Sequence, residues 1–422
     1  MRMELLFHTL NRFLGTDTRY LMRGSFWLTI GSMSGMLIGL LLSIAYAHYL
    51  PKETYGSYRY VLSFVSIVGI FSLPGFGTAI TRSSARGFDG TFRRLSRIMF
   101  FSSFGISIVC VSVAAFFFFH DQKELTLALV IAGLLMPFVE GMGSWKGYLD
   151  GKKQFRNKTV YNITTQIIYG ILMAAAVIGS YALGFGLTLT LALLAGTYMF
   201  THALPNLYFY TRTLHSIPRE APEEPGSVRY GLHLSASSVP ATFATYLDGV
   251  LLYHLLGPSA LAVYSFAILL PEQIKALLAT YINVSLPKLA ANTADTKAQL
   301  IAKKTLPRKI FRASLLSIII VGGYISVAPF AYHILFPAYV ESVPYSQIFA
   351  LSLILFPFSV FGPSIQMEGS IRKIYLESIA GPLFQILLLI ILLPPFGIWG
   401  AVWGRVIGRT VNFILEFIIF MK

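Results

Sequence analysis

Long apolar stretches recur along almost the whole chain and limit what it can fold into. A helix that crosses the hydrocarbon core of a bilayer needs about 20 mostly apolar residues. Only helices or closed barrels satisfy every backbone polar group within that core. By this rule the sequence predicts twelve spanning helices, at residues 24–50, 57–81, 98–119, 125–147, 161–183, 187–210, 231–256, 260–285, 312–336, 344–367, 376–394 and 398–420.

The composition favours an integral membrane protein. Of the 422 residues, 55% are hydrophobic and only 12% are charged, whereas a soluble globular chain carries about 25% charged residues. The one cysteine, Cys110, lies within an apolar stretch, so no disulfide bond can form within the chain. We therefore expect an all-α integral membrane protein.

The net charge of +15 would also suit a nucleic-acid-binding protein, so the positions of the positive charges must decide. If the N-terminus lies inside the cell, the inner connections hold most of the 33 lysines and arginines. The outer loops hold only Lys52 and Lys123. This distribution follows the positive-inside rule for short loops. We therefore expect both termini in the cytoplasm and no nucleic-acid partner.

A polar segment near the middle of the chain separates two sets of six spans. SIPREAPEEPG, residues 216–226, is rich in Pro and Glu and lies between the sixth and seventh spans. Because each set has an even number of spans, both sets enter the membrane in the same direction. We therefore predict two parallel six-helix bundles at residues 23–215 and 230–422, joined by a cytoplasmic linker at 216–229 and preceded by a cytosolic amphipathic segment at 1–22.

A helix–turn–helix pattern that recurs 206 residues apart supports this internal repetition. The first copy is AYAHYLPKETYGSYRYVLSFVSI at residues 45–67, and the second is DGVLLYHLLGPSALAVYSFAILLPEQIK at residues 248–275. In this register Tyr58 aligns with Tyr264. Each copy opens one half of the chain, as expected for a two-fold internal repeat.

Charged side chains within the predicted spans are the first candidates for a functional site, because a charge inside the bilayer is costly. In the last span Arg405, Arg409, Asn412 and Glu416 recur at spacings of three and four residues and therefore share one helix face. Arginine binds phosphate in bidentate fashion, so this face would suit a cavity for an anionic substrate. Structural ion pairs with carboxylates of other helices are the alternative.

Five further charged residues lie within other spans or at their ends. Glu272 and Lys275 lie one turn apart in the eighth span, where they form a local ion pair or part of a cavity. Arg59 begins the second span and either lines a cavity or extends to the outer surface. Asp248 and Glu140 have no cation nearby in the sequence. Such carboxylates bind Na⁺, carry a proton or pair with the arginines of the last span.

The sequence contains no motif typical of an enzyme. It has no GK[ST] phosphate-binding loop, no HExxH, no GxSxG and no cluster of Cys and His residues. A membrane glycan polymerase or ligase would need a sizeable outer loop, and the predicted outer loops are short. We therefore expect no catalytic residues, no metal site and no cofactor.

Four segments carry a family resemblance: AHYLPKETYGSYRYVLS (47–63), DGVLLYHLLGPSALAVYSFA (248–267), VSLPKLA (284–290) and PPFGIWGAVWGR (394–405). They resemble bacterial polysaccharide and O-antigen flippases of the multidrug/oligosaccharidyl-lipid/polysaccharide (MOP) exporter superfamily. With twelve predicted spans, the resemblance covers essentially the whole chain. It implies a MATE-like fold, in which two six-helix bundles form a V that alternates between inward-open and outward-open states.

The resemblance also implies a function. Such flippases move an oligosaccharide on an undecaprenyl-pyrophosphate carrier across the bacterial cytoplasmic membrane. A cationic central cavity holds the pyrophosphate-sugar head group while the lipid tail stays in the bilayer. From the placement of charge in this chain, we expect substrate-binding cations at Arg59, Lys275, Arg405 and Arg409, and ion coupling or charge pairing at Glu140, Asp248, Glu272 and Glu416.

The expected partners are the lipid-linked glycan, membrane lipids and other glycan-assembly proteins, and we expect a monomer that is driven by H⁺ or Na⁺. The main alternative is a multidrug or cation antiporter of the same superfamily, whose cavity would be dominated by carboxylates. A membrane glycan polymerase or ligase is a further alternative, and a non-transporting scaffold for envelope assembly is the last.

Overall fold

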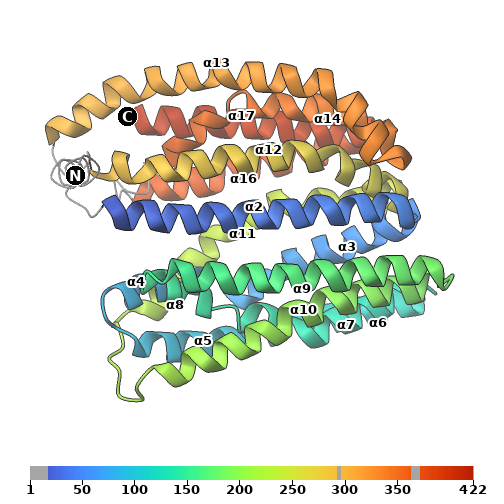
Figure 1. The fold of residues 1–422 in the computed structure, drawn as a ribbon, viewed down its shortest axis with the longest axis horizontal. Helices are drawn as coiled ribbons and strands as arrows, with labels where there is room; N and C mark the ends of the chain where they lie inside the picture. Colours follow the sequence, from blue (N-terminus) through green and yellow to red (C-terminus); the bar gives the residue numbers. More distant parts are fainter. Residues whose placement is uncertain (1–17, 292–295, 363–370, 422) are drawn as a thin grey trace, which may run out of the picture. The chain divides into compact units, whose positions relative to one another are not determined.

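The computed structural model describes residues 18–291, 296–362 and 371–421, which form helices joined by short turns (Figure 1). No strand occurs among these residues, so the predicted all-α class is confirmed. The predicted amphipathic segment at 1–22 lies outside the described residues, apart from its last five, which begin the first helix.

Helices of the first half are broken in several places. In chain order they are α2 (Thr18–Tyr49), α3 (Lys52–Val68), η1 (Gly69–Ser72), α4 (Gly75–Ala85), α5 (Gly90–Ser102), α6 (Phe104–Phe119), α7 (Lys123–Met136), the π-helix η2 (Pro137–Gly141), α8 (Trp145–Gly151), α9 (Phe155–Ala182) and α10 (Leu187–Ser216).

The second half begins after the polar segment between Ser216 and Ser227. Its elements are α11 (Ser227–Leu256), α12 (Pro258–Ala291), α13 (Thr296–Leu335), η3 (Pro337–Ser342), α14 (Val343–Ala350), η4 (Leu351–Leu353), η5 (Phe356–Val360), α16 (Ile371–Phe396) and α17 (Ile398–Met421).

Each of the twelve predicted spans is mainly helical over its described residues. Within the described part of the chain, eight helices are long and apolar enough to cross a membrane, or nine if the bent pair of 52–72 and 75–85 forms one span. α11 and α17 have 30 and 24 residues and are not among them, although their length suffices. Both carry charged side chains that the sequence singled out.

Proline explains two of the breaks. Pro74 lies where the bent pair turns by 49°, directly after Leu73, whose φ of 57° is left-handed. Pro137 begins the π-helix η2. Proline removes a backbone donor and collides with the preceding turn, so a helix bends or widens there. Pro205 and Pro240, by contrast, lie inside the continuous helices α10 and α11.

The chain divides into two compact units. We call residues 34–265 together with 335–338 the N-terminal unit, and residues 1–33, 266–334 and 339–422 the C-terminal unit. α11 falls in the N-terminal unit, where it packs against α3 and α4. These units need not coincide with the repeated six-helix bundles, so the predicted bundle boundaries stay a prediction.

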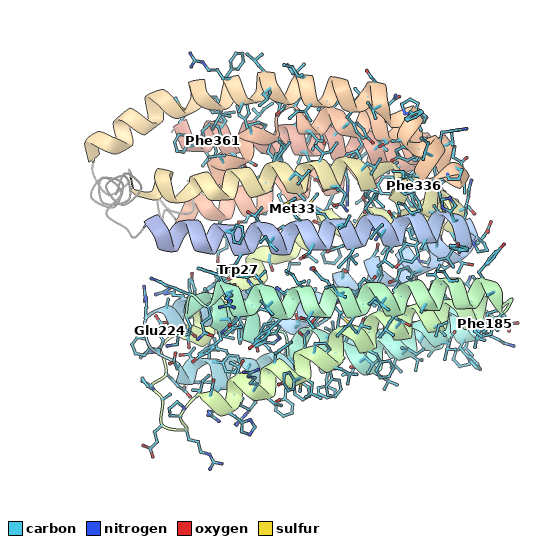
Figure 2. The ribbon with its side chains drawn as sticks, in the orientation of Figure 1. Trp27, Met33, Phe185, Glu224, Phe336 and Phe361 are labelled. Carbon is cyan, nitrogen blue, oxygen red and sulfur yellow. The ribbon has the colours of Figure 1, made fainter. Side chains whose placement is uncertain are left out.

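One end of the N-terminal unit has an aromatic core and holds the linker in place. Trp145 is buried there and donates a hydrogen bond from Nε1 to Asn206 at 3.1 Å. The linker residue Glu224 accepts hydrogen bonds from Ser83 at 2.5 Å and from Arg86 at 2.8 Å. Glu224 and Phe185 lie at opposite ends of this unit (Figure 2). The linker and the turn at Phe185 therefore lie at opposite ends of the long helices of this unit.

Candidate functional site

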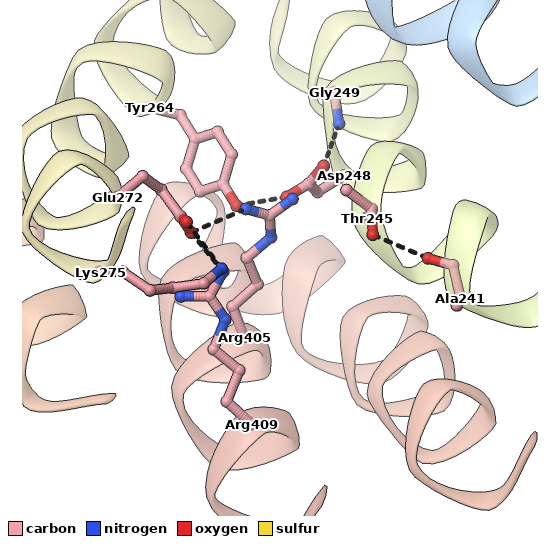
Figure 3. A network of polar contacts seen from close by, with 9 residues as sticks. All are labelled: Ala241, Thr245, Asp248, Gly249, Tyr264, Glu272, Lys275, Arg405 and Arg409. Carbon is pink, nitrogen blue, oxygen red and sulfur yellow. Dashed lines mark hydrogen bonds and ion pairs between the residues drawn. The ribbon is translucent and has the colours of Figure 1, made fainter. Parts of the chain in front are cut away.

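The C-terminal unit gathers three predicted cations around one carboxylate (Figure 3). Lys275 Nζ donates to Glu272 Oε2 at 2.8 Å. Arg409 Nη2 donates to Glu272 Oε1, and Arg405 Nη1 lies 4.0 Å from the same oxygen. We call these four residues the cationic cluster. Its formal charge is positive, because one carboxylate faces three cations.

Two helices supply the cluster through ordinary helical spacing. Glu272 and Lys275 are three residues apart on α12, and Arg405 and Arg409 are four residues apart on α17, so each pair lies on one helix face. The i, i+3 pair expected from the sequence is therefore present, and so is the pairing of the α17 arginines with a carboxylate of another helix.

A separate glycine stripe holds α17 against α16. A Cβ at Gly400 would lie 2.0 Å from the carbonyl oxygen of Leu392, and a Cβ at Gly408 would lie 2.7 Å from Cγ of Gln385. Small residues at this spacing let helix backbones approach closely in a membrane. The glycine face thus fixes α17, while its arginine face remains available to α12.

The arginines are the buried part of the cluster. The side chains of Arg405 and Arg409 are 8% and 17% exposed, whereas those of Glu272 and Lys275 are 30% and 34% exposed. The Arg409 guanidinium lies 4.8 Å from the ring centre of Phe349, and its Nη1 is buried without a hydrogen-bond partner. Excess positive charge and an unused donor together suit the binding of an anion.

Glu416 lies beyond the cluster on α17. It is buried and accepts a hydrogen bond from Asn412 Nδ2 at 2.6 Å, four residues earlier on the helix. The predicted polar stripe of the last span therefore has two parts: Arg405 and Arg409 turn to Glu272, and Asn412 turns to Glu416. Sequence reasoning placed these four residues on one face correctly, but it missed Phe349, which has no signal in the sequence.

Arg59 belongs to the N-terminal unit, where the two copies of the repeated hairpin meet. Arg59 Nε donates to Ser265 Oγ at 3.3 Å, and Ser259 Oγ donates to Glu53 Oε1 at 2.8 Å. Both pairs are 206 residues apart, which is the spacing of the repeat. Equivalent positions therefore contact each other, as expected for two copies related by an approximate two-fold axis. This spacing was the signal that could have identified Ser265.

The two predicted carboxylates of the N-terminal unit lie in different surroundings. Asp248 on α11 is 3% exposed and accepts hydrogen bonds from the Tyr264 hydroxyl and from the backbone N–H of Gly249 (Figure 3). Tyr264 is the residue that aligns with Tyr58 in the repeat. Glu140 lies on the π-helix η2, and its side chain is exposed. Short π-helical segments are frequent at functional sites.

Solved structures of transporters share this fold. An inward-facing multidrug resistance MATE family transporter of the MOP superfamily is 17% identical, with 91% of this chain and 93% of that chain covered at a TM-score of 0.62. An outward-facing transporter of the same description is 15% identical, with 94% of each chain covered at a TM-score of 0.60. A MOP superfamily transporter from Pyrococcus furiosus, described by a reversed polarity of its binding pocket that suggests a different function, is 15% identical, with 94% of each chain covered at a TM-score of 0.58.

These likenesses define the class: the chain is a multi-pass membrane protein with the MATE-like fold of MOP-superfamily transporters, as predicted. Residues 21–293 match the polysaccharide biosynthesis protein family, and the chain belongs to this family. No curated protein matches the sequence.

Proposed function

We propose that the protein is a flippase that moves undecaprenyl-pyrophosphate-linked oligosaccharide across the bacterial cytoplasmic membrane by alternating access. The oligosaccharide is the repeat unit of an O-antigen, a capsule or an exopolysaccharide. Both termini lie in the cytoplasm, as the distribution of Lys and Arg predicts. The protein acts as a monomer without catalytic chemistry, and its partners are the lipid-linked glycan, membrane lipids and other glycan-assembly proteins.

The cationic cluster is the observation that carries this proposal. A pyrophosphate head group presents several anionic oxygens, and Arg and Lys side chains are the residues that bind such oxygens. Lys275, Arg405 and Arg409 provide these donors within helices of a membrane protein. Membership in a polysaccharide biosynthesis family supports a glycan on the other side of the pyrophosphate.

Arg59, in the N-terminal unit, is a further cation that we propose for substrate binding. Its partner in the structure is a neutral hydroxyl, Ser265 Oγ, so its charge is available to a head group. Asp248 and Glu140 are the candidates for coupling transport to H⁺ or Na⁺, since each is a carboxylate within a predicted span. Neutralising Asp248 should then remove any dependence of transport on pH or Na⁺.

An exporter of cationic drugs is the second candidate, because two of the similar structures are multidrug resistance transporters. Such a substrate would require a site with excess negative charge. The described cluster has the opposite sign, and the Pyrococcus transporter is likewise described by a reversed pocket polarity. The sign of the charge therefore favours an anionic substrate.

Complementation tests the proposal. The chain is expressed in flippase-deleted strains with different surface glycans, next to the double variant Arg405→Gln/Arg409→Gln and the matched control Arg97→Gln, an exposed arginine on α5. We expect the wild type and the control to restore surface glycan and the double variant to fail at equal membrane levels. Restoration by the double variant would refute the role of the cluster. Absence of restoration in every strain, with raised resistance to cationic dyes, would favour the drug exporter.

A further inference from the structure

We propose that Glu272 is a resident counter-ion of the cationic cluster, so that the anionic head group binds by displacing its carboxylate and leaves when the carboxylate returns. This inference rests on the proposed function, because it assumes an anionic substrate at the cluster. It assigns Glu272 a role in setting affinity and release, which differs from the roles of the three cations.

The first argument is that Glu272 occupies the donors a phosphate would use. Its two oxygens bind different cations: Oε2 accepts from Lys275 at 2.8 Å, and Oε1 accepts from Arg409, with Arg405 at 4.0 Å. A phosphoryl group also places anionic oxygens in contact with Lys and Arg donors. The carboxylate and the head group would therefore compete for the same atoms.

The second argument is that Glu272 can leave these donors. Its side chain is 30% exposed, so the carboxylate has access to solvent, whereas Arg405 at 8% and Arg409 at 17% are more deeply placed. A flexible side chain at the exposed side of the cluster can turn away while the arginines remain in position. Arg409 Nη1 is buried without a partner, so one donor of the cluster is available before the exchange begins.

The third argument concerns release. A transport site must bind its substrate strongly enough to load and weakly enough to unload. Without Glu272, Lys275, Arg405 and Arg409 would lose the carboxylate that contacts all three of them. The carboxylate both lowers the charge of the occupied site and takes the place of the head group when it departs.

A purely structural ion pair between α12 and α17 makes the opposite prediction. If Glu272 only holds the two helices together, its neutralisation should loosen the cluster and weaken anion binding. If Glu272 competes with the substrate, its neutralisation should strengthen binding. Once displaced, the carboxylate would lie about 6–12 Å from the anion; removing one unit charge at that distance, at the effective dielectric constant of about 20 that suits protein sites, changes affinity by roughly 10- to 100-fold.

The experiment measures binding of farnesyl pyrophosphate to the purified full chain. Farnesol is the comparison ligand without charge, and inorganic pyrophosphate is the comparison ligand without a lipid tail. We expect Glu272→Gln to bind farnesyl pyrophosphate about 10- to 100-fold more tightly than the wild type, and to export glycan with a lower KM and a lower kcat. Glu272→Asp keeps the charge and should bind within a few-fold of the wild type. Lys275→Met should bind about tenfold more weakly. Glu223→Gln, a half-exposed linker carboxylate, is the control for charge removal elsewhere.

Two results separate the failure of this inference from the failure of the proposed function. If the wild type binds farnesyl pyrophosphate and Arg405→Gln/Arg409→Gln does not, but Glu272→Gln binds no more tightly than the wild type, the counter-ion role is wrong and the flippase proposal stands. If the wild type binds farnesyl pyrophosphate no better than farnesol, the proposed anion-binding site is wrong, and the proposed role of Glu272 is wrong as well.

Discussion

Replacing Gly56 with alanine should force apart the two repeated hairpins of the N-terminal unit. Gly56 lies on α3, where an added Cβ would be 1.8 Å from the carbonyl oxygen of Pro258 and 2.5 Å from its carbonyl carbon. Both atoms belong to the backbone at the start of α12, so no side chain can rotate out of the way. The hairpins must therefore separate, and the Glu53–Ser259 and Arg59–Ser265 hydrogen bonds lie at the same contact.

The geometry sets the magnitude. Real Cβ contacts are essentially never shorter than 3.0 Å, so the shift needed from 1.8 Å exceeds an ångström. Overpacking of this kind costs about 1–3 kcal/mol, and a rigid backbone neighbour favours the upper end. About 3 kcal/mol lowers the equilibrium constant for the packed arrangement by roughly 100-fold.

Thermal unfolding and hydrogen exchange of the detergent-purified protein measure this effect, with glycan export as the functional readout. Gly69→Ala is the matched control, because its Cβ would meet nothing within 4 Å and its φ of −53° suits alanine. We expect Gly56→Ala to melt at a lower temperature, to exchange faster at the α2–α3 and α11–α12 turns, and to lose export. A Gly56→Ala protein that matches Gly69→Ala in melting and exchange would refute the reasoning.

Two further predictions concern the end of the N-terminal unit that holds the linker. The hydrogen bond from Ser83, together with the nearby Arg82 and Arg86, lowers the pKa of Glu224 from its ordinary 4.5. The charged carboxylate therefore stabilises the fold fully at pH values above the ordinary pKa, and this stabilisation is lost as the pH falls through the lowered pKa. Glu224→Gln should therefore lower the melting temperature at pH 7, and its effect should shrink as the pH falls through the lowered pKa of Glu224. Glu223→Gln should do little at any pH, and a loss in Glu224→Gln that does not shrink with falling pH would contradict the linkage. Asn206→Leu removes the hydrogen-bond partner of the buried Trp145 Nε1 and of the Val139 carbonyl, so it should lower the free energy of unfolding by about 2–4 kcal/mol. The exposed Asn157→Ala is the control in urea or thermal unfolding. Equal stability of the two variants would contradict this prediction.

The spans of this protein were determined by the sequence alone, because the requirement is local. Every backbone polar group in a bilayer must be satisfied within its own helix, so an apolar run of about 20 residues predicts a helix whatever it later contacts. The same holds for the stripe of Arg405, Arg409 and Glu416, since helical periodicity assigns residues to a face. The repeat at a separation of 206 residues could also be recognised in the sequence, because internal duplication keeps equivalent residues at a constant spacing.

The partners across helices were decided only by the tertiary structure. Periodicity shows which face of α17 carries the arginines, but it does not show which helix that face meets. Packing brought Glu272 to Arg409, and it brought the Tyr264 hydroxyl and the Gly249 N–H to Asp248. Packing likewise gave Arg59 a hydroxyl partner in the other hairpin, where the sequence had left it to a cavity or to the outer surface. Such pairings depend on the position and rotation of whole helices, which no single segment encodes.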